Sequence, residues 1–314
     1  MQADSLHRSL IHGSSVNGAF LIDKPSGLSS AQVVSRIKKC FRLEKAGHAG
    51  TLDPMATGLL IVLSGKATRL QSIFLESLKA YRGMIRLGER TTTDDVQGEV
   101  IEADDKLAFL HQSDIELMIE RIRRAFSGEQ VQVPPQVSAV KVDGVRSYAR
   151  ARRGEAVELS SRRVTLEFLD LLFEPPRTLR YAIRVSKGFY VRSLARDIGI
   201  FLKSAACLES ICRFECGGFE LAEAQSLEAL LDQGVEASPG GAFVPLDELI
   251  ARFPKVVLDD EHCAHIRNGE QRTLQRVSQN FPADARFVAV FTEENRFFSL
   301  LERGEANKWQ FRLN

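Results

Sequence analysis

The sequence predicts a mixed α+β fold that is rich in strands. Short apolar runs typical of strands occur beside longer segments whose apolar residues recur at helical spacing. These elements do not follow the regular strand–helix–strand alternation of a parallel α/β sheet. With 314 residues, of which 44% are hydrophobic and 26% charged, the chain has the length of one large domain or two smaller ones.

The chain is predicted to begin with a strand and a helix. Residues 18–23 form an apolar run that ends at a Lys-Pro-Ser-Gly turn. Ser29 or Ser30 can then cap a helix that keeps its apolar residues on one side as far as Phe41. Residues 45–58 contain three glycines and no periodicity, which indicates a loop.

The later elements follow without a repeating order. Strands are expected at 59–63, 81–87, 98–102, 138–142, 164–173 and 181–185, and helices at 66–78, 113–126 and 191–202. Ser113 and Glu116 are predicted to form a capping box, and Asp143-Gly144 a hairpin turn.

Composition marks one domain boundary. The cluster Ser238-Pro239-Gly240-Gly241 is the best candidate for a linker. The roughly 65 residues beyond Pro245 are enough for a small β module, with strands at 287–291 and 297–301. The predicted organisation is a flexible extension over residues 1–17, a main domain over 18–244 and a small domain over 245–314.

Several classes of protein are excluded by composition. Residues 1–16 are polar and lack the apolar core of a signal peptide, and the longest apolar run, 59–63, is too short to span a bilayer. We therefore expect a cytoplasmic protein without membrane segments. The cysteines lack the paired spacing of zinc ligands, so reduced thiols and no metal are expected. They are Cys40, Cys207, Cys212, Cys216 and Cys263.

Charge is segregated along the chain although its sum is only +1. Five basic residues and no acidic one lie between Arg180 and Arg196. Residues 141–163 carry seven bases against three acids, whereas residues 94–105 carry six acids and no base. A protein with one basic and one acidic face can bind a polyanion, although each block alone also fits solvated surface charge.

Asp53 is the strongest candidate for chemistry, because it lies in the glycine-rich loop between Leu52 and Pro54. A carboxylate held in such a loop by a cation can act as a nucleophile or general base. The alternative is an ordinary Asp-Pro turn. The loop lacks the spacing of a phosphate-binding P-loop, and His48 has no second histidine or cysteine pair that would indicate a metal site.

Tyr81 and Arg192 are weaker candidates from pattern alone. Tyr81 lies on a predicted strand among basic residues, where it can stack on a nucleobase or fill the core. Arg192 lies where a predicted strand leads into a helix, and its pattern is that of a surface arginine in the basic block.

Several motifs occur in one order along the chain. They are Leu21-Ile22-Asp23-Lys24-Pro25-Ser26-Gly27, the loop from Gly47 to Leu60, Tyr81-Arg82-Gly83 with Leu87-Gly88, Thr92-Thr93-Asp94, Gln132-Val133-Pro134-Pro135 with Ser138-Ala139-Val140-Lys141, and Lys187-Gly188-Phe189-Tyr190-Val191-Arg192. In this order and spacing, over nearly the whole chain from Gly18, the sequence resembles the TruB family of bacterial tRNA pseudouridine-55 synthases.

The resemblance implies a fold and a reaction. The expected fold is the mixed, mainly antiparallel sheet of pseudouridine synthases with flanking helices, followed by a PUA-like RNA-binding module. The expected reaction isomerises the uridine at position 55 in the T-arm of tRNA to pseudouridine, and it needs no cofactor and no metal. The expected partner is the T-arm stem-loop, bound by a monomer. Without a lysine-rich extension, no guide RNA is expected. Assistance to tRNA folding is a second activity compatible with the same family.

Individual roles also come from the resemblance. Asp53 matches the catalytic aspartate, Tyr81 the residue that stacks on the flipped base, and Arg192 the partner that keeps the aspartate ionised and aimed. Lys24 matches a lysine that supports the catalytic loop, and Ile211 an apolar position against the target base. His48 matches a histidine that fills the space left by the flipped bases. The other expected RNA contacts come from the two basic blocks, of which the second is expected to matter more; they are Lys141, Arg184, Lys187, Tyr190 and Arg196.

The sequence departs from the family pattern at one pair of neighbouring residues. The family usually carries two arginines after the position of Ile211, whereas this chain has Cys212-Arg213. We expect this pair to lie in an RNA-facing or structural turn, so the departure puts one contact in doubt and leaves the chemistry unaffected.

Overall fold

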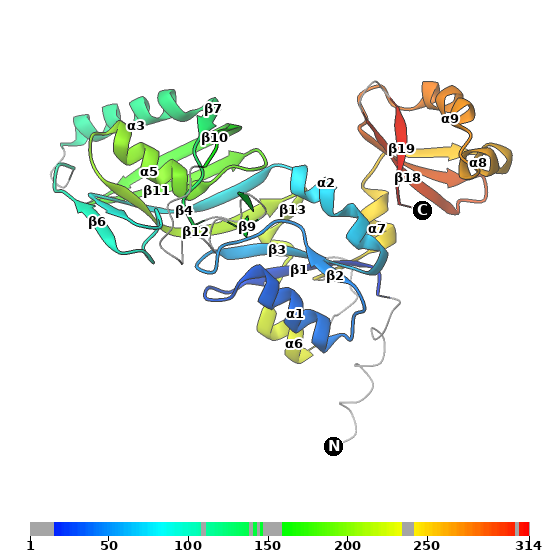
Figure 1. Ribbon diagram of the computed structural model, residues 1–314, viewed down its shortest axis with the longest axis horizontal. Helices are drawn as coiled ribbons and strands as arrows, with labels where there is room; N and C mark the ends of the chain where they lie inside the picture. The colour runs from blue at the N-terminus through cyan, green and yellow to red at the C-terminus, as the bar shows by residue number, and fades with distance from the viewer. Residues whose placement is uncertain are drawn as a thin grey trace, which may run out of the picture.

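One mixed sheet forms the body of the molecule (Figure 1). The computed structural model describes residues 16–107, 111–137, 141–142, 145–146, 159–233, 242–304 and 308–313, and eleven strands of this part belong to the sheet. They are β1 (Gly18–Lys24), β2 (Ala46–His48), β3 (Thr57–Ser64), β4 (Lys79–Leu87), β7 (Gly128–Gln132), β10 (Arg162–Glu174), β11 (Thr178–Val185), β12 (Ala206–Cys216), β13 (Phe219–Glu220), β14 (Gln225–Ser226) and β15 (Phe243–Pro245).

The pairing of these strands confirms a mainly antiparallel α+β core. The order is β14-β1-β3-β12-β4-β11-β10-β7, with β15 beside β1, β2 beside β3 and β13 beside β12. Among the described strands of this sheet, only β1 with β14 and β3 with β12 run parallel. The second of these parallel pairs is short, because it joins Thr57 to Cys212 and Gly58 to Arg213 and goes no further.

Both faces of the β1–β3 half of the sheet are buried. On β1, Phe20 and Ile22 face a core shared with helices α1 (Ser30–Cys40) and α6 (Leu227–Gln233). Ala19 and Leu21 point to the opposite face and pack in a second core. Strand side chains alternate between faces, so this near-continuous apolar run is what a strand covered on both sides requires.

The other half of the sheet is covered on one face by helices α3 (Gln112–Phe126) and α5 (Val191–Phe201). On the opposite face Met84, Phe168 and Leu172 are exposed. Tyr81 and Ile211 pack against the core of α5 and also against the core of α1. Tyr81 and Ile211 therefore lie where the two halves of the sheet meet, on the face that is covered by α1 and α5.

Most predicted elements are confirmed. The helix at α1 starts with Ser29 as its N-cap, and Gln32 completes a capping box. The strands at 18–23, 59–63, 81–87, 164–173 and 181–185 and the helix at 191–202 are present with small changes in their bounds. The strand at 98–102 is part of a hairpin of β5 (Glu89–Thr91) and β6 (Val100–Ala103).

Three local predictions are wrong. The region predicted as one helix over 66–78 is a 3-10 helix, η2 (Gly65–Leu70), followed by a short α2 (Gln71–Glu76). It ends early because Nζ of Lys79 donates to the carbonyls of Phe74, Leu75 and Ser77. The loop at 45–58 begins with β2, which pairs with β3.

The third wrong prediction is the capping box of Ser113 and Glu116. Helix α3 begins one residue earlier than predicted, with His111 as an N-cap that makes no side-chain bond. Ser113 therefore lies inside the first turn, and the side chain of Glu116 accepts a hydrogen bond from Gln112 at 3.1 Å.

Some predicted features fall outside the described residues. They are the N-terminal extension up to residue 15, residues 138–140, the Asp143-Gly144 turn and the linker at 238–241. The two short strands on either side of that turn, β8 (Lys141–Val142) and β9 (Val145–Arg146), are described and pair in antiparallel fashion.

The C-terminal residues form a second sheet beside the first (Figure 1). Its order is β16 (Lys255–Leu258), β17 (Phe287–Thr292), β18 (Phe297–Arg303) and β19 (Trp309–Leu313), which confirms the predicted β module. Helices α8 (Asp260–Arg267) and α9 (Gln271–Val277) share its core. We call Lys255 to Leu313 the C-terminal module.

The C-terminal module is attached to the main sheet by apolar and charged contacts. Helix α7 (Leu246–Ala251) packs on β1, and Leu300 joins the same core as Phe74 of α2. Arg286 also pairs with Glu76 of α2 at 2.5 Å. The separate sheet thus begins after α7, and the division at residue 244 stays a prediction.

No helix in the described part of the chain combines the length and the apolar character needed to cross a membrane.

Candidate active site

Asp53 is held in a loop that the connection between β1 and α1 fixes in place. The hydroxyl of Ser30, at the start of α1, donates to the carbonyl of Leu52 at 3.1 Å and accepts from its N–H at 2.8 Å. The carbonyl of Pro54 accepts from the N–H of Gly27 at 2.8 Å. The residues on both sides of Asp53 are therefore tied to the β1–α1 connection, and its carboxylate is presented from a rigid loop.

Glycine is required where this loop enters β3. Gly58 has φ +97°, and a Cβ there would lie 2.3 Å from the carbonyl oxygen of Arg213. A side chain would push β3 away from β12 at the short parallel pairing that joins the two halves of the sheet.

The carboxylate of Asp53 contacts Arg192, which is the predicted partnership. Nε of Arg192 donates to Oδ2 of Asp53 at 2.9 Å. Arg192 is in the first turn of α5 and its side chain is only 5% exposed, whereas that of Asp53 is 39% exposed. The geometry thus leaves one side of the carboxylate open to a ligand while the other side faces a buried cation.

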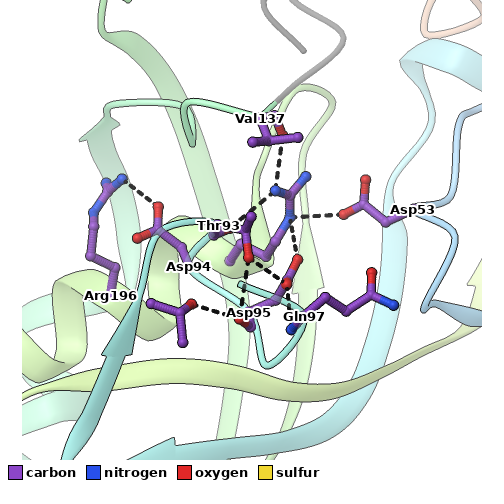
Figure 2. Close-up of polar contacts among 9 residues, drawn as sticks. Asp53, Thr93, Asp94, Asp95, Gln97, Val137 and Arg196 are labelled. Atoms are coloured by element: carbon purple, nitrogen blue, oxygen red, sulfur yellow. Dashed lines mark hydrogen bonds and ion pairs between the residues drawn. The ribbon is translucent and has the colours of Figure 1, made fainter. Parts of the chain in front are cut away.

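A second carboxylate shares the same guanidinium (Figure 2). Oδ2 of Asp95 lies 3.7 Å from Nε of Arg192 and is buried. Its other oxygen accepts from the hydroxyl of Thr93 at 2.7 Å and from the N–H of Gln97 at 3.0 Å. Asp95 therefore lies behind Arg192 as a second buried carboxylate, held in place by the turn at residues 93–97.

Backbone carbonyls complete the coordination of Arg192. Nη1 donates to the carbonyl of Val137 at 2.9 Å and to that of Thr93 at 3.3 Å. Figure 2 shows Val137, Asp95 and Asp53 around this group from three different segments. A planar guanidinium with donors in a fixed fork suits such a site better than an ammonium group does.

A cleft of about 320 Å³ opens in front of Asp53. Asp53, Tyr81, Ile211 and the segment 185–192 line it. Burial raises the pKa of the Tyr81 hydroxyl, and the positive charge of Arg213 opposes that rise. An aromatic ring, an isoleucine and a carboxylate at one cleft are suited to hold a flat, partly apolar group against an anion.

Lys24 lies beneath the loop that carries Asp53. It is fully buried, and its Nζ donates to the carbonyls of Pro25 at 2.8 Å and Pro54 at 3.2 Å. Burial lowers the pKa of Lys24 to about 8, an effect that the charge of Asp53 opposes and that of Arg213 increases. The lysine thus contacts the backbone immediately after Asp53, and the supporting role that the resemblance implies for it stays a prediction.

Replacing Lys24 with methionine should remove a pH dependence from the stability of the protein. The pKa of Lys24 is about 8 when folded, below the ordinary 10.5, so the folded state loses this proton first as the pH rises. Between these two values the unfolded state binds more protons, and the wild-type free energy of unfolding rises with pH, by about 2 kcal/mol at about pH 9.5. Below the folded pKa both states are protonated and the contribution is constant.

Urea unfolding of wild type and Lys24→Met at about pH 7 and about pH 9.5 measures this effect. Subtracting one protein from the other removes the titration of all other groups that the two share. If both proteins respond equally to pH, Lys24 does not titrate in this range.

Of the other predicted RNA contacts, two line the cleft. Lys187 is 64% exposed at its rim, 3.6 Å from Glu76. Tyr190 stacks under Arg162 and exchanges two backbone hydrogen bonds with the side chain of Gln132. His48 lies on β2 with its carbonyl bonded to Gln71 at 2.8 Å. RNA contacts by these three residues stay predictions.

The remaining predicted contacts are elsewhere. Arg184 alternates with Ile183 on β11, so it projects from the face opposite the α5 core and pairs with Glu215 at 2.5 Å. Arg196 is 12% exposed and bonds to Asp94 at 3.1 Å, Asp197 and the carbonyl of Val133. These partners give Arg196 a place in the protein framework, and its contact with RNA stays a prediction. The side chain of Lys141 falls outside the described residues.

Two residues of the site were missed by reasoning from the sequence. In the sequence Asp95 belongs to an acidic block, although it directly follows Thr92-Thr93-Asp94, one of the motifs that carry the resemblance. Arg213 was expected in a turn; it lies inside β12, and it is fully buried. Residues two positions apart in a strand point to the same face of the sheet. The position of Arg213 two residues after Ile211 was therefore the available signal for an inward-pointing arginine.

Among the described residues, no three His, Cys, Asp or Glu side chains are grouped to hold a metal ion, and the five cysteines are free thiols.

Comparison with known proteins gives a consistent result. A family model described as TruB family pseudouridylate synthase, N-terminal domain, matches residues 38–191. The tRNA pseudouridine synthase B of Dinoroseobacter shibae is 42% identical over 258 residues, which cover 82% of this chain and 83% of that protein. The tRNA pseudouridine synthase B of Neisseria meningitidis serogroup B is 37% identical over 289 residues, covering 91% and 90%.

A solved structure shares the fold. A chain from the crystal structure of a Cbf5-Nop10-Gar1 complex matches with a TM-score of 0.64 and 25% identity, covering 95% of this chain and 83% of that chain.

Proposed function

Because the chain belongs to the TruB family of pseudouridylate synthases, we propose that it converts the uridine at position 55 in the T-arm of tRNA to pseudouridine. The observation that carries this proposal is the half-exposed carboxylate of Asp53, held at 2.9 Å by buried Arg192 at the end of a cleft that contains Tyr81. The names of the curated relatives support tRNA as the substrate.

The cleft can accept a base only after the base leaves its stack. Extruding a nucleotide costs a few kcal/mol. Stacking on the ring of Tyr81 returns about 1–3 kcal/mol of this cost. Ile211, on the neighbouring strand, supplies an apolar surface beside the base. In this proposal the two residues hold the uracil while its bond to the sugar is broken.

Asp53 carries the chemistry in this proposal. The bond between N1 of uracil and C1′ of ribose breaks, the uracil turns, and a bond forms between C5 and the same C1′. The proton on C5 is then released and N1 gains one, so the product is an isomer and no electron or group carrier is needed. Asp53 acts either as a nucleophile on the sugar or base, or as a base that removes a ribose proton.

The proposed partner is the T-arm itself, bound directly by one copy of the chain in the cytoplasm and without a guide RNA. Residues 18–244 are proposed as the catalytic domain, and 245–314 as a PUA-like domain that binds another part of the tRNA. The link from Arg286 of the C-terminal module through Glu76 to Lys187 supports a role of this module in binding the same tRNA, because the module lies next to the rim of the cleft.

Tritium release tests the proposed function. An unmodified tRNA transcript labelled at C5 of uracil should release tritium when incubated with the wild-type protein. The same transcript with cytidine in place of the T-arm uridine should release none. Absence of release from the first transcript, with tRNA binding retained, would overturn the proposal and favour a role in tRNA folding alone.

Replacing Lys187 with alanine should weaken tRNA binding in a salt-dependent manner. Its ammonium group is exposed at the cleft, and its ion pair with Glu76 is long, at 3.6 Å. A phosphate of the tRNA can therefore replace Glu76 as its partner. Loss of one phosphate contact should lower the slope of log Kd against log salt by about one. Filter binding over about 50–300 mM salt measures this slope.

The matched control is Arg180→Ala, which removes another exposed base of the same block. Arg180 projects from the opposite face of the sheet and pairs with Glu174 at 3.3 Å. Its slope should equal that of wild type. An unchanged slope in Lys187→Ala would remove this residue from the RNA contacts.

A further inference from the structure

A buried arginine next to the cleft is used by none of the steps above. Arg213 is 1% exposed and is the largest side chain in the fully buried set. Burying a guanidinium is unfavourable unless its N–H groups find acceptors. In the described part of the chain it forms no ion pair with a carboxylate, so its acceptors must be neutral groups.

Those acceptors belong to the catalytic loop and to the strand that follows it. Nη2 of Arg213 donates to the carbonyl of Gly50 at 3.2 Å, three residues before Asp53. Nε donates to the carbonyl of Leu59 at 2.8 Å, just after the loop joins β3. The guanidinium therefore spans the two ends of the segment that carries the catalytic aspartate.

The loop is shaped to admit this group. Gly50 has φ +119°, which a residue with a side chain rarely adopts. A Cβ at this position would lie 3.2 Å from Nη1 of Arg213, closer than almost all real Cβ contacts. The glycine thus allows the loop backbone to approach the guanidinium directly.

Arg213 also contacts the residue on the other wall of the cleft. It is paired with Tyr81 across β12 and β4, so both side chains project to the same face of the sheet. Both side chains line the cleft with Asp53, and the positive charge of Arg213 acts on the Tyr81 hydroxyl. One buried group therefore touches the tyrosine and the aspartate loop together.

We propose that Arg213 is a positioning residue that fixes the ring of Tyr81 and the loop of Asp53 relative to each other. It acts through these two elements and does not touch the reacting atoms. The catalytic part of this inference rests on the proposed function, whereas the contact with Tyr81 is a property of the protein alone.

Single-turnover measurements on Arg213→Met and Arg213→Lys test the catalytic part, with Arg180→Lys as a control on the opposite face. Misplacing a reacting group by about 1 Å costs about 100-fold in rate. We therefore expect Arg213→Met to slow tritium release about 100-fold, and Arg213→Lys to recover part of the loss, while the Kd for tRNA stays within about threefold of wild type. Arg180→Lys should match wild type.

A spectroscopic measurement separates positioning from general stability. In protein labelled with 3-fluorotyrosine, the ¹⁹F resonance of Tyr81 is assigned by its loss in Tyr81→Phe. The positive charge of Arg213 lowers the pKa of Tyr81 against the effect of burial, so Arg213→Met should move the titration of this resonance to higher pH. The resonance should titrate as in wild type in Arg180→Lys.

The rate measured in the Tyr81→Phe background completes the test. If Arg213 acts through Tyr81, Arg213→Met should slow this background clearly less than it slows wild type. Equal slowing in both backgrounds with an unmoved ¹⁹F titration would overturn the proposal, as would a loss confined to Kd. If Arg213→Met does not fold, Arg213→Gln, which also removes the positive charge, carries both measurements.

The two proposals fail separately. A wild-type protein that releases no tritium from tRNA contradicts the proposed function, yet the ¹⁹F titration still shows whether Arg213 sets the environment of Tyr81.

Discussion

Replacing Asp53 with asparagine should lower tritium release from tRNA by about 10⁴-fold or more, the scale of loss seen when a catalytic nucleophile is removed. The amide keeps the shape of the side chain and can still accept the hydrogen bond of Arg192, but it is neither a nucleophile nor a base. The Kd for tRNA should stay within about threefold of wild type, because the other walls of the cleft are unchanged.

The matched control for this substitution is Asp170→Asn. Asp170 also pairs with an arginine, Arg123, at 2.9 Å, but it lies on the exposed face away from the cleft. Single-turnover tritium release and filter binding on both variants give the comparison. Activity in Asp53→Asn within tenfold of wild type would show that the carboxylate is not the catalytic group. An assay of tRNA folding would show whether any assistance to folding survives without it.

Replacing Arg192 with methionine should reduce both activity and stability. Asp95 would be left as a buried carboxylate without its cation, which typically costs about 3–5 kcal/mol of unfolding free energy. Asp53 would lose the group that aims it, so we expect tritium release to fall by about 10³-fold. Arg192→Lys should restore part of the stability but little activity, because an ammonium cannot reproduce the fork that reaches Asp53 and the two carbonyls.

Urea unfolding and single-turnover kinetics test this expectation. Arg123→Met serves as the comparison, since it breaks an exposed pair of the same 2.9 Å length and should cost less than about 1 kcal/mol. If the two substitutions cost the same stability, the buried arrangement around Arg192 contributes nothing beyond an ordinary surface pair.

The parts of the fold with strong local signals were predicted from the sequence. The helix at α1 has an apolar face and a serine cap, and the strands at β1 and β3 are short continuous apolar runs. Where the ending of an element depends on a distant group, the prediction fails. Helix α2 stops because Lys79 takes its last carbonyls, and the pattern of residues 66–78 does not contain that information.

The residues of the site also divide into those that were predicted from the sequence and those that were not. The contact between Asp53 and Arg192, 139 residues apart, was expected because the resemblance supplied both partners, and the structure places them together. Asp95 was not expected, because a carboxylate in an acidic block has the pattern of a solvated surface residue. Arg213 was assigned to a turn, because the pair Cys212-Arg213 was considered without the alternation of β12. Burial of a charge depends on tertiary neighbours, which a local pattern does not specify.

The short pairing between β3 and β12 has a mechanical consequence. The two halves of the sheet share only the backbone pairs Thr57–Cys212 and Gly58–Arg213 along this boundary, so side-chain contacts carry much of the connection between them. Asp53 belongs to one half and Arg192 to the other, and their ion pair crosses this boundary. A substrate that draws Asp53 away from Arg192 therefore also removes one of the connections that keep the two halves at a fixed angle.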